Sequence, residues 1–400
     1  MSIFRTYSAD SPTPKITNGE ANIGEMNFAI VDMGQGDCTI ISDPNNKVYV
    51  IDCGSIDRMP KKSMTTAQAV LRKWAAGNTI ELIITHPDRD HYNKFWDLLV
   101  EADPTVNVKN IYFSRAKSDT SPLGNYSVGF FSSNLNHFGN PDLIEVTLNE
   151  TKNELKIWRE STAYTVPKTE TIFSTFELAR GEVNEKAWSI SIIAGNVKSK
   201  LRSSNELNNT ASLVTLVQYD DLKLLLTGDS TSETFAFLEK SHADIIKDVD
   251  IFQIPHHGSE SSRPKASFVK LVNPKTLIVS VGLMNSSFFL PKKSIIDAWL
   301  KSKNLRKESL VVDYWVLGNQ DYDSRKKLNV LLKEVWKKYP VSHNKNSSFW
   351  WLDKPDDARK SGTGFYGFSN RNYFLYRITS DKDIWITGVE GSLWNETWEM

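Results

Sequence analysis

The stretch LIITHPDRDH, residues 82–91, is an apolar run that ends at a dense cluster of possible metal ligands. His86, Asp88, Asp90 and His91 lie within its last six positions. Residues two apart on an extended backbone point the same way, so His86 and Asp88 can contact one cation. Asp90 and His91, at the turn into the next segment, can contact a second. Imidazole with carboxylate suits Zn, Mn or Fe, although the motif taken alone could equally be a hydrated polar loop.

Two further clusters follow apolar runs later in the chain. LLLTGDS (224–230) contains Asp229, and DVDIFQIPHHGSESS (248–262) contains His256 and His257. Each has an ordinary structural interpretation, since an aspartate after a strand commonly caps a helix and two loop histidines can simply be hydrogen-bonded. Four of the seven histidines nevertheless fall in two short motifs. Three strand-end clusters in this order therefore predict one shared metal site.

The segments around these clusters alternate between strand and helix patterns. Strands are predicted where short apolar runs are bounded by turn residues, and helices where apolar residues recur every three to four positions. Strands covered by helices in both halves predict an α/β fold built as a layered sandwich. The predicted strands are 26–33, 37–42, 47–54, 79–85, 108–114, 187–195, 211–219, 222–228, 248–255 and 275–282, and the predicted helices are 64–77, 231–242, 266–272 and 291–304.

These segments predict one main domain at residues 25–304. Residues 1–24 are polar and contain two prolines, so we expect a loose N-terminal arm. Residues from about 100 to 185 give weak signals and are expected to form a variable insertion. A C-terminal α+β extension is expected at 305–400, with a basic amphipathic helix at 325–339 and a tail that holds five of the 12 tryptophans.

Composition narrows the class of protein. The 400 residues are 40% hydrophobic and 24% charged, as in soluble globular proteins, and the formal net charge is zero. That balance argues against a global field for binding polyanions, while local basic patches remain possible. Cys38 and Cys53 lie in apolar segments and are expected to be small buried hydrophobic residues. Without a signal sequence or an apolar run of membrane-spanning length, we expect a cytoplasmic protein with no membrane partner.

The ordered motifs carry a resemblance. VIDCG (50–54), THPDRDH (85–91), LLTGD (225–229) and IPHHGS (254–259) together resemble the metallo-β-lactamase superfamily of metal-dependent hydrolases. MGQGDCTII (33–41) and NNTASLVTLV (208–217) are similar to one branch, the hydrolase domain of bacterial competence DNA-uptake (ComEC-type) proteins. The resemblance covers roughly residues 26–300 and is poor at 100–185. It implies a four-layer αββα sandwich with a two-metal centre at one edge of the sheets.

The resemblance also implies the ligands of both metals. Asp229 would bridge the two metals, and Asp90 and Asp229 would be the catalytic carboxylates. Of the histidine pair, His257 is the favoured ligand, and His256 would then support a ligand or face the substrate. Carried over by position, the ligands are His86 and Asp88 for the first metal, and Asp90, His91 and one of His256 and His257 for the second.

Two aspartates outside the motif loop are implied to support the site. Asp52 matches the early aspartate of the superfamily, which holds the motif loop through hydrogen bonds. Asp37 belongs to the GQGD turn that comes near the metals.

The chain departs from the usual pattern at the first metal. Asp88 stands where many superfamily members carry a histidine, and LNNTASL (207–213) replaces the segment that usually supplies another. Asn208 or Asn209 would be at best a weak neutral donor there. Leu290 stands in place of the histidine of a GHP motif. Because an oxygen-rich first position favours Mn or Mg over Zn, we expect one or two divalent ions, Zn or Mn, with Mg as a further option.

Such a centre predicts a hydrolase that needs no serine or cysteine nucleophile. Two cations about 3.5–4 Å apart lower the pKa of a bound water towards about 7 and stabilise charge on an attacked phosphorus or carbonyl. Ser259, Arg263 and Lys265 follow the histidine pair and would contact a phosphate, although each could be an ordinary polar loop residue. We therefore expect a phosphodiesterase or nuclease that acts on DNA, RNA or a nucleotide messenger, within a bacterial (antiviral) defence or DNA-handling system.

Two alternatives stay open. The same centre could hydrolyse a thioester or lactone. The chain could also be a metal-binding, weakly catalytic scaffold of a multi-protein defence assembly, with the aromatic C-terminal region as the surface for a protein partner.

Overall fold

The computed structural model describes most of residues 24–302 and short stretches outside them. The basic helix predicted at 325–339 lies outside the described residues. The described residues are 4–5, 24–31, 33–56, 63–101, 105–114, 126–159, 162–165, 175–198, 204–274, 276–280, 290, 292–299, 301–302, 312–313, 342–343, 350–351, 373–378 and 384–388.

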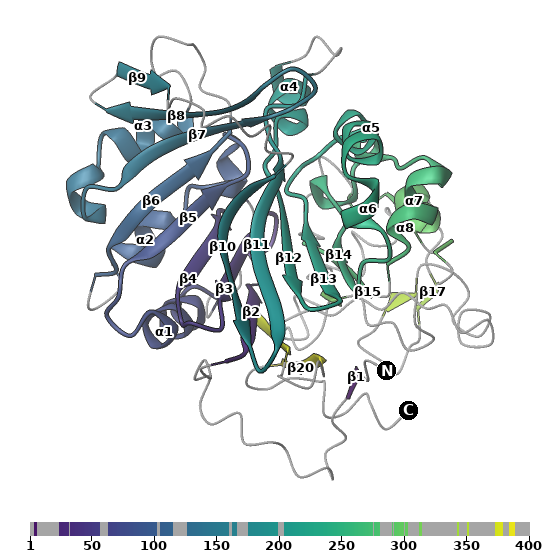
Figure 1. The fold of residues 1–400 in the computed structure, drawn as a ribbon, viewed down its shortest axis with the longest axis horizontal. Coiled ribbons are helices and arrows are strands. Elements are labelled where there is room, and N and C mark those ends of the chain that lie inside the picture. Colours follow the sequence, from purple (N-terminus) through teal and green to yellow (C-terminus); the bar gives the residue numbers. More distant parts are fainter. Residues whose placement is uncertain are drawn as a thin grey trace.

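A large mixed sheet carries the N-terminal half of the described chain (Figure 1), in the order β1-β20-β19-β2-β3-β4-β5-β6-β7-β8-β9. β2, β3 and β4 form an antiparallel meander, whereas β4 to β7 run parallel, so the carboxyl ends of β4 and β5 lie at the same edge. The strands are β1 (Phe4–Arg5), β2 (Met26–Val31), β3 (Cys38–Ser42), β4 (Val48–Cys53), β5 (Ile80–Ile84), β6 (Val108–Phe113), β7 (Asp142–Leu148), β8 (Asn153–Arg159), β9 (Thr162–Thr165), β19 (Tyr373–Ile378) and β20 (Ile384–Gly388).

The second sheet has the order β10-β11-β12-β13-β14-β15-β16. β10 to β13 are antiparallel, and β13 to β16 run parallel. Its strands are β10 (Phe176–Val183), β11 (Lys186–Ala194), β12 (Val214–Tyr219), β13 (Leu222–Leu226), β14 (Ile251–Gln253), β15 (Thr276–Val279) and β16 (Val312–Asp313), and β17 (Ser342–His343) pairs with β18 (Trp350–Trp351) apart from both sheets.

Helices cover the outer faces of the two sheets (Figure 1). Alternate residues of β2 show the layers, because neighbouring side chains of a strand point to opposite faces. Phe28 and Ile30 pack in one buried cluster with β11 to β15, while Ala29 and Val31 pack in another with Trp74 of the first helix. The first sheet is covered by α1 (Ser63–Ala75), α2 (Phe95–Leu99) and α3 (Tyr126–Ser132), and the second by α5 (Ser232–Ser241), α6 (Ala243–Ile246), α7 (Ala266–Val272) and α8 (Lys293–Trp299).

The α/β class expected from the sequence is confirmed, as two mixed sheets packed face to face between helical layers. The weak region at 100–185 contains regular structure, since β7, β8 and β9 extend the first sheet and β10 begins the second. The strand predicted at 108–114 is β6, whereas β10 gives a weak sequence signal because it alternates between partly buried and exposed positions along its length. Among the described residues, no helix has the length and apolar character needed to cross a bilayer.

Beyond residue 304, β19 and β20 belong to the first sheet and β16 to the second, while β17 and β18 pair only with each other. β19 pairs with β2 along its whole length, with Leu375 opposite Ala29, and β16 extends the second sheet. Most of residues 305–400 lies outside the described chain, so the domain boundary near residue 304 stays a prediction.

Candidate metal centre

The three predicted clusters meet where strands of both sheets end. β5 leads into His86 and the short helix η1 (Arg89–His91), β13 leads to Asp229, and β14 leads into η4 (His256–Gly258). β13 and β14 are adjacent and parallel, so their carboxyl ends lie side by side. The facing sheet brings the end of β5 to the same place. Segments far apart in the sequence therefore surround one buried position.

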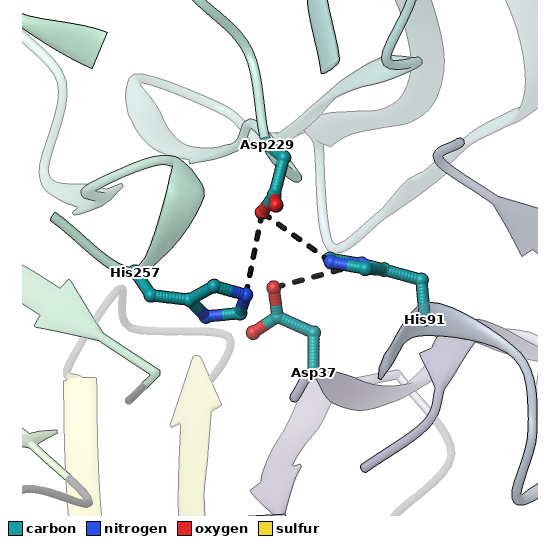
Figure 2. A group of neighbouring side chains, drawn as sticks. All are labelled: Asp37, His91, Asp229 and His257. Carbon is teal, nitrogen blue, oxygen red and sulfur yellow. Dashed lines mark ion pairs between the residues drawn. The ribbon is translucent and has the colours of Figure 1, made fainter. Parts of the chain in front are cut away.

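Asp229 lies at the centre of this cluster and is only 3% exposed. Its Oδ1 lies 3.3 Å from Nε2 of His91 and 3.6 Å from Nε2 of His257, and Figure 2 shows the carboxylate between these two rings. Its Oδ2 lies 3.6 Å from Nε2 of His86 and 3.7 Å from Nε2 of His256. Each carboxylate oxygen therefore faces its own pair of imidazoles.

The four imidazoles are held in the same way, each by a contact at Nδ1 that leaves Nε2 facing Asp229. A carbonyl oxygen can only accept a hydrogen bond, so Nδ1 of His257 carries a hydrogen, and once the ring loses its second proton the lone pair lies on Nε2. Metal-binding histidines are commonly oriented by such a contact. The Nδ1 atoms lie 3.1 Å from Thr85 Oγ1 in His86, 2.7 Å from Asp52 Oδ2 in His91, 2.6 Å from Ser261 Oγ in His256 and 2.5 Å from the Ser280 carbonyl oxygen in His257.

Asp52 ties the ends of β4 and β5 to the motif loop. Its carboxylate accepts hydrogen bonds from the backbone N–H (2.8 Å) and the hydroxyl (2.6 Å) of Thr85, besides the contact with His91. Asp52 has a φ of 56°, in the left-handed region that aspartate enters more readily than most residues. Two residues later, a Cβ added to Gly54 would lie 2.2 Å from the carbonyl carbon of Asp90. The backbone after β4 therefore packs directly on the loop that carries the ligands.

Two more carboxylates lie on the side of His91 and His257. Asp90 Oδ2 is 3.4 Å from Nε2 of His257, and Asp37 Oδ2 is 3.9 Å from Nδ1 of His91. Asp37, His91, Asp229 and His257 are all buried, and each offers a ligand atom within 4.8 Å of the others (Figure 2). The sequence assigned Asp37 a supporting role, whereas this closeness makes it a candidate ligand.

Asp88 lies on the other side, with His86. Its Oδ2 is 3.7 Å from Nε2 of His86, and its Oδ1 accepts a 3.0 Å hydrogen bond from the amide of Asn208. Asp88 is only partly buried, unlike Asp229.

Opposite charges shift the pKa values in the cluster. Burial alone would lower the pKa of His257, but the charge of Asp229 and the contact with Asp90 raise it to about 10. Burial is likewise outweighed at His91, where Asp229 and Asp52 raise the pKa well above its usual value. Burial would raise the pKa of Asp229, yet the imidazoles around it, His257 and His91 first, hold the pKa well below its usual value. Groups with pKa values driven apart in this way are typical of functional sites.

Burial dominates at two other groups. It lowers the pKa of His256, which favours the neutral imidazole, and it raises the pKa of the Asp37 carboxyl. At Asp88 and Asp90, contacts with His86 and His257 respectively outweigh burial and lower the pKa of each carboxyl.

The donor set fits a divalent metal ion. Nε2 of His86, His91 and His257 and Oδ1 of Asp229 are buried and have no hydrogen-bond partner among the described residues. An unsatisfied buried polar group costs roughly 1–3 kcal/mol, and a cation would satisfy all four atoms. Imidazole nitrogen with carboxylate oxygen is a donor set of Zn or Mn sites. The buried His/Asp cluster is therefore a candidate metal site.

The residues predicted to bind substrate lie on the loop after the histidine pair. Ser259 is partly buried, and its carbonyl oxygen accepts a 2.6 Å hydrogen bond from the Ser262 hydroxyl. Arg263 and Lys265 are exposed, and the Arg263 guanidinium pairs with Glu260. Their side chains have no described contact with the His/Asp cluster, so their role in substrate binding stays a prediction.

The structure removes one interpretation of Asp229 and adds residues that the sequence analysis missed. Thr231, not Asp229, is the N-cap of α5, since its hydroxyl accepts from the backbone N–H of Glu233. Ser280 holds His257, and Gln253 donates a 3.1 Å hydrogen bond to Asp37 Oδ1. Both lie at the carboxyl ends of parallel strands of the second sheet, and that position at the end of a predicted strand is the sequence feature that could have indicated them.

No protein-family model matches the chain, and no curated protein matches it. Among solved structures, a variant of the CmlA β-hydroxylase aligns at 14% identity and a TM-score of 0.36, covering 66% of this chain and 47% of that one. Human tRNase Z, short form, aligns at 12% identity with a TM-score of 0.36, and the alignment covers 64% of this chain and 92% of that one. CmlA from Streptomyces venezuelae, a diiron β-hydroxylase, aligns at 15% identity with a TM-score of 0.34, and the alignment covers 78% of this chain and 51% of that one. The chain spans about half the length of the CmlA structures, and at these TM-scores the likenesses carry no weight for its function.

Proposed function

We propose that this chain is a metal-dependent phosphodiesterase that hydrolyses DNA, RNA or a nucleotide messenger with an activated water. One observation carries the proposal: imidazoles from two distant segments direct buried Nε2 atoms, which make no hydrogen bond among the described residues, at the two oxygens of Asp229. A folded protein does not ordinarily leave such atoms unsatisfied unless a ligand completes them.

The residues of the chain would divide the work as follows. His86 and Asp88 would hold a first cation, while Asp90, His91 and His257 would hold a second, and Asp229 would contact both. When bound, divalent cations lower the pKa of a water molecule and stabilise the charge that develops on an attacked phosphorus. Asp52 keeps His91 in the orientation that directs Nε2 into the cluster.

A phosphodiester is favoured over a thioester or lactone for two reasons. The carboxylates of Asp88, Asp90 and Asp37 make the ligand set rich in oxygen, which suits the hard cations that assist phosphoryl chemistry. The sequence motifs are also similar to those of the competence DNA-uptake branch, which favours a nucleic-acid substrate in a bacterial defence or DNA-handling system; a cytoplasmic location stays an expectation from the sequence. Ser259 and Lys265 would bind a phosphate oxygen, and Arg263 would do so after exchanging its partner Glu260.

The test uses the full chain loaded with Mn, Zn or Mg, and substrates of both classes. Single-stranded DNA, RNA and cyclic nucleotides represent phosphodiesters, and thioesters and lactones represent the alternative hydrolase. The negative control is Asp229→Ala. A matched control is Asp43→Asn, because Asp43 is an equally buried aspartate whose carboxylate accepts from the backbone of Asn45 and Lys47 in a turn after β3.

Cleavage of a phosphodiester by the wild type and by Asp43→Asn, with none by Asp229→Ala, is the expected result. Cleavage of esters alone would replace the proposal with the carbonyl hydrolase. No cleavage above the Asp229→Ala level, with less than one metal per chain, would favour the scaffold that binds protein partners through the aromatic C-terminal region.

A further inference from the structure

The first metal position lacks a histidine that the sequence between the first two clusters would be expected to supply. Only His137 lies between His91 and Asp229 in the sequence. It belongs to η3 (Leu135–Phe138), and its ring centroid lies 5.0 Å from that of Trp96 on α2, in the helical layer outside the first sheet. His137 therefore does not lie at the first position, and a second histidine ligand there would come from another part of the chain.

His256 meets the requirements for this role. Its Nε2 lies 3.7 Å from Oδ2 of Asp229, the same oxygen that lies 3.6 Å from Nε2 of His86. Its Nδ1 is held by the hydroxyl of Ser261 at 2.6 Å, just as Ser280 holds Nδ1 of His257. The two adjacent histidines thus approach Asp229 in the same manner but face different oxygens.

The backbone explains how neighbouring residues can reach both oxygens. His256 and His257 have φ values of 51° and 50°, in the left-handed region that residues other than glycine seldom enter, least of all in succession. The backbone N–H of His256 donates a 3.1 Å hydrogen bond to the carbonyl oxygen of Gly228, next to Asp229. As a result the two rings stand 6.3 Å apart at 68° to one another. Strained backbone of this kind is retained mainly at functional sites.

The helix α4 (Ser204–Thr210) carries asparagines where the expected histidine is missing, and they contact the same position. The amide of Asn208 donates to Oδ1 of Asp88 at 3.0 Å, and the amide nitrogen of Asn209 lies 3.2 Å from Nε2 of His256. The Oδ1 atom of Asn209 is buried and has no hydrogen-bond partner among the described residues. Both asparagines are therefore arranged around the potential ligands of the first metal.

We propose that His256 is the second histidine ligand of the first metal, with His86, Asp88 and Oδ2 of Asp229, and that Asn208 is a positioning residue for Asp88. The adjacent histidines then belong to different metals, His256 to the first and His257 to the second. A cation at the first position would replace the contact between Asn209 and the Nε2 lone pair of His256. The inference rests on the proposed function only in requiring a metal centre, and does not depend on the substrate.

The experiment measures metal binding to the full chain, independently of hydrolysis. Bound Mn²⁺ is counted by mass spectrometry, and electron paramagnetic resonance distinguishes a coupled pair of Mn²⁺ ions from a single ion. The wild type is expected to bind two ions with a coupled spectrum. His256→Ala and His257→Ala are each expected to bind one ion with an uncoupled six-line spectrum. His137→Ala, which removes a histidine from the outer helical layer, should behave as the wild type.

Asn208→Ala tests the positioning role. It should weaken one Mn²⁺ site about 10-fold and leave the other unchanged, which a general loss of stability would not do. Asn208→Asp, which can still contact Asp88 only when protonated, should weaken the same site at neutral pH. Equal weakening of both sites, or of neither, would show that Asn208 does not position Asp88.

Two results would overturn the assignment of His256. In the first, His256→Ala still binds two coupled ions. In the second, the wild type binds only one ion, and that ion still binds to His256→Ala but not to His257→Ala. Should His256→Ala fail to fold, the wild type loaded with Co²⁺ still decides, because each bound histidine has an Nδ1–H that gives a hyperfine-shifted exchangeable proton signal. Four such signals are expected, and three would refute the proposal.

These outcomes separate the two proposals. Two metals in the wild type without phosphodiester cleavage would defeat the proposed function and leave the assignment of His256 intact. Phosphodiester cleavage by the wild type, together with two metals retained in His256→Ala, would leave the proposed function intact and defeat the assignment of His256. No metal in the wild type would defeat both.

Discussion

Asp52 holds His91 through a contact of 2.7 Å between its Oδ2 and Nδ1 of the ring. Both side chains are essentially inaccessible to solvent, at 1% and 0% exposure. Because Asp52 also accepts two hydrogen bonds from Thr85, one carboxylate links the ends of two neighbouring strands to a potential ligand. This link is the part of the site most easily altered without removing a ligand.

Asp52→Asn should weaken metal binding by about 10–100-fold, as is usual when the partner of a ligating histidine is changed. Asparagine tolerates the left-handed φ of 56° but lacks the negative charge. Its amide N–H can also donate to Nδ1 of His91, which would leave the hydrogen on Nε2, the atom that must bind the metal. Calorimetric titration with Mn²⁺ or Zn²⁺ measures the change. Asp43→Asn is the matched control, and an equal loss of affinity in both variants would contradict the assigned role of Asp52.

Asp229→Asn should abolish binding at both positions, because each oxygen of this carboxylate faces a separate pair of imidazoles. The buried imidazoles would also lose their counter-charge. Removing one partner of a buried ion pair costs about 3–5 kcal/mol, so the metal-free variant should unfold at lower denaturant concentration than the metal-free wild type. Metal analysis and urea titration test both parts. Full occupancy of even one position would show that Asp229 does not join the two.

Gly54→Ala should displace the loop that carries Asp90. The added Cβ would lie 2.2 Å from the carbonyl carbon of Asp90 and 2.4 Å from the backbone nitrogen of His91, and neither backbone atom can turn aside. Overpacking of this kind costs about 1–3 kcal/mol, and metal affinity should fall with it. Gly77→Ala is the control, because its added methyl group meets nothing within 4 Å and its φ of 83° affects only the turn after α1. A lowered Tm with unchanged metal affinity in Gly54→Ala would be the contrary result.

Metal uptake should release protons. The pKa of His257 is raised to about 10 and that of His91 well above its usual value, so the metal-free protein carries both protons at pH 7. A cation needs the lone pair on Nε2, so about two protons per chain should be released and the apparent affinity should rise with pH. Calorimetry at pH 7 in two buffers of different ionisation enthalpy counts the protons. A binding enthalpy that does not depend on the buffer would contradict this expectation.

The elements that position the site could largely be predicted, because their signals are local. The meander of β2, β3 and β4 follows from three apolar runs separated by turn residues, and α1 and α5 follow from helical spacing. Between residues 100 and 185 the strand predicted at 108–114 is confirmed as β6, but the strands after it could not be placed, since β8 and β10 mix polar and apolar residues on partly exposed faces.

The composition of the candidate site was less predictable. Asp229 could be a helix cap or a ligand until Thr231 was seen to cap α5. Ser261 lies among ordinary polar residues and Ser280 at the end of an apolar run, and only their contacts with His256 and His257 distinguish them. Asp37 lies closer to the cluster than its supporting role implied.

The amino-acid sequence alone determined the α/β class and the order of the three strand-end motifs, because hydrophobic periodicity and residue type act over a few neighbouring positions. Which histidine faces which oxygen of Asp229, and which atom contacts each Nδ1, follows from the folded arrangement of the two sheets. Those contacts join segments from both sheets, and side chains that meet across such distances leave no local pattern in the chain.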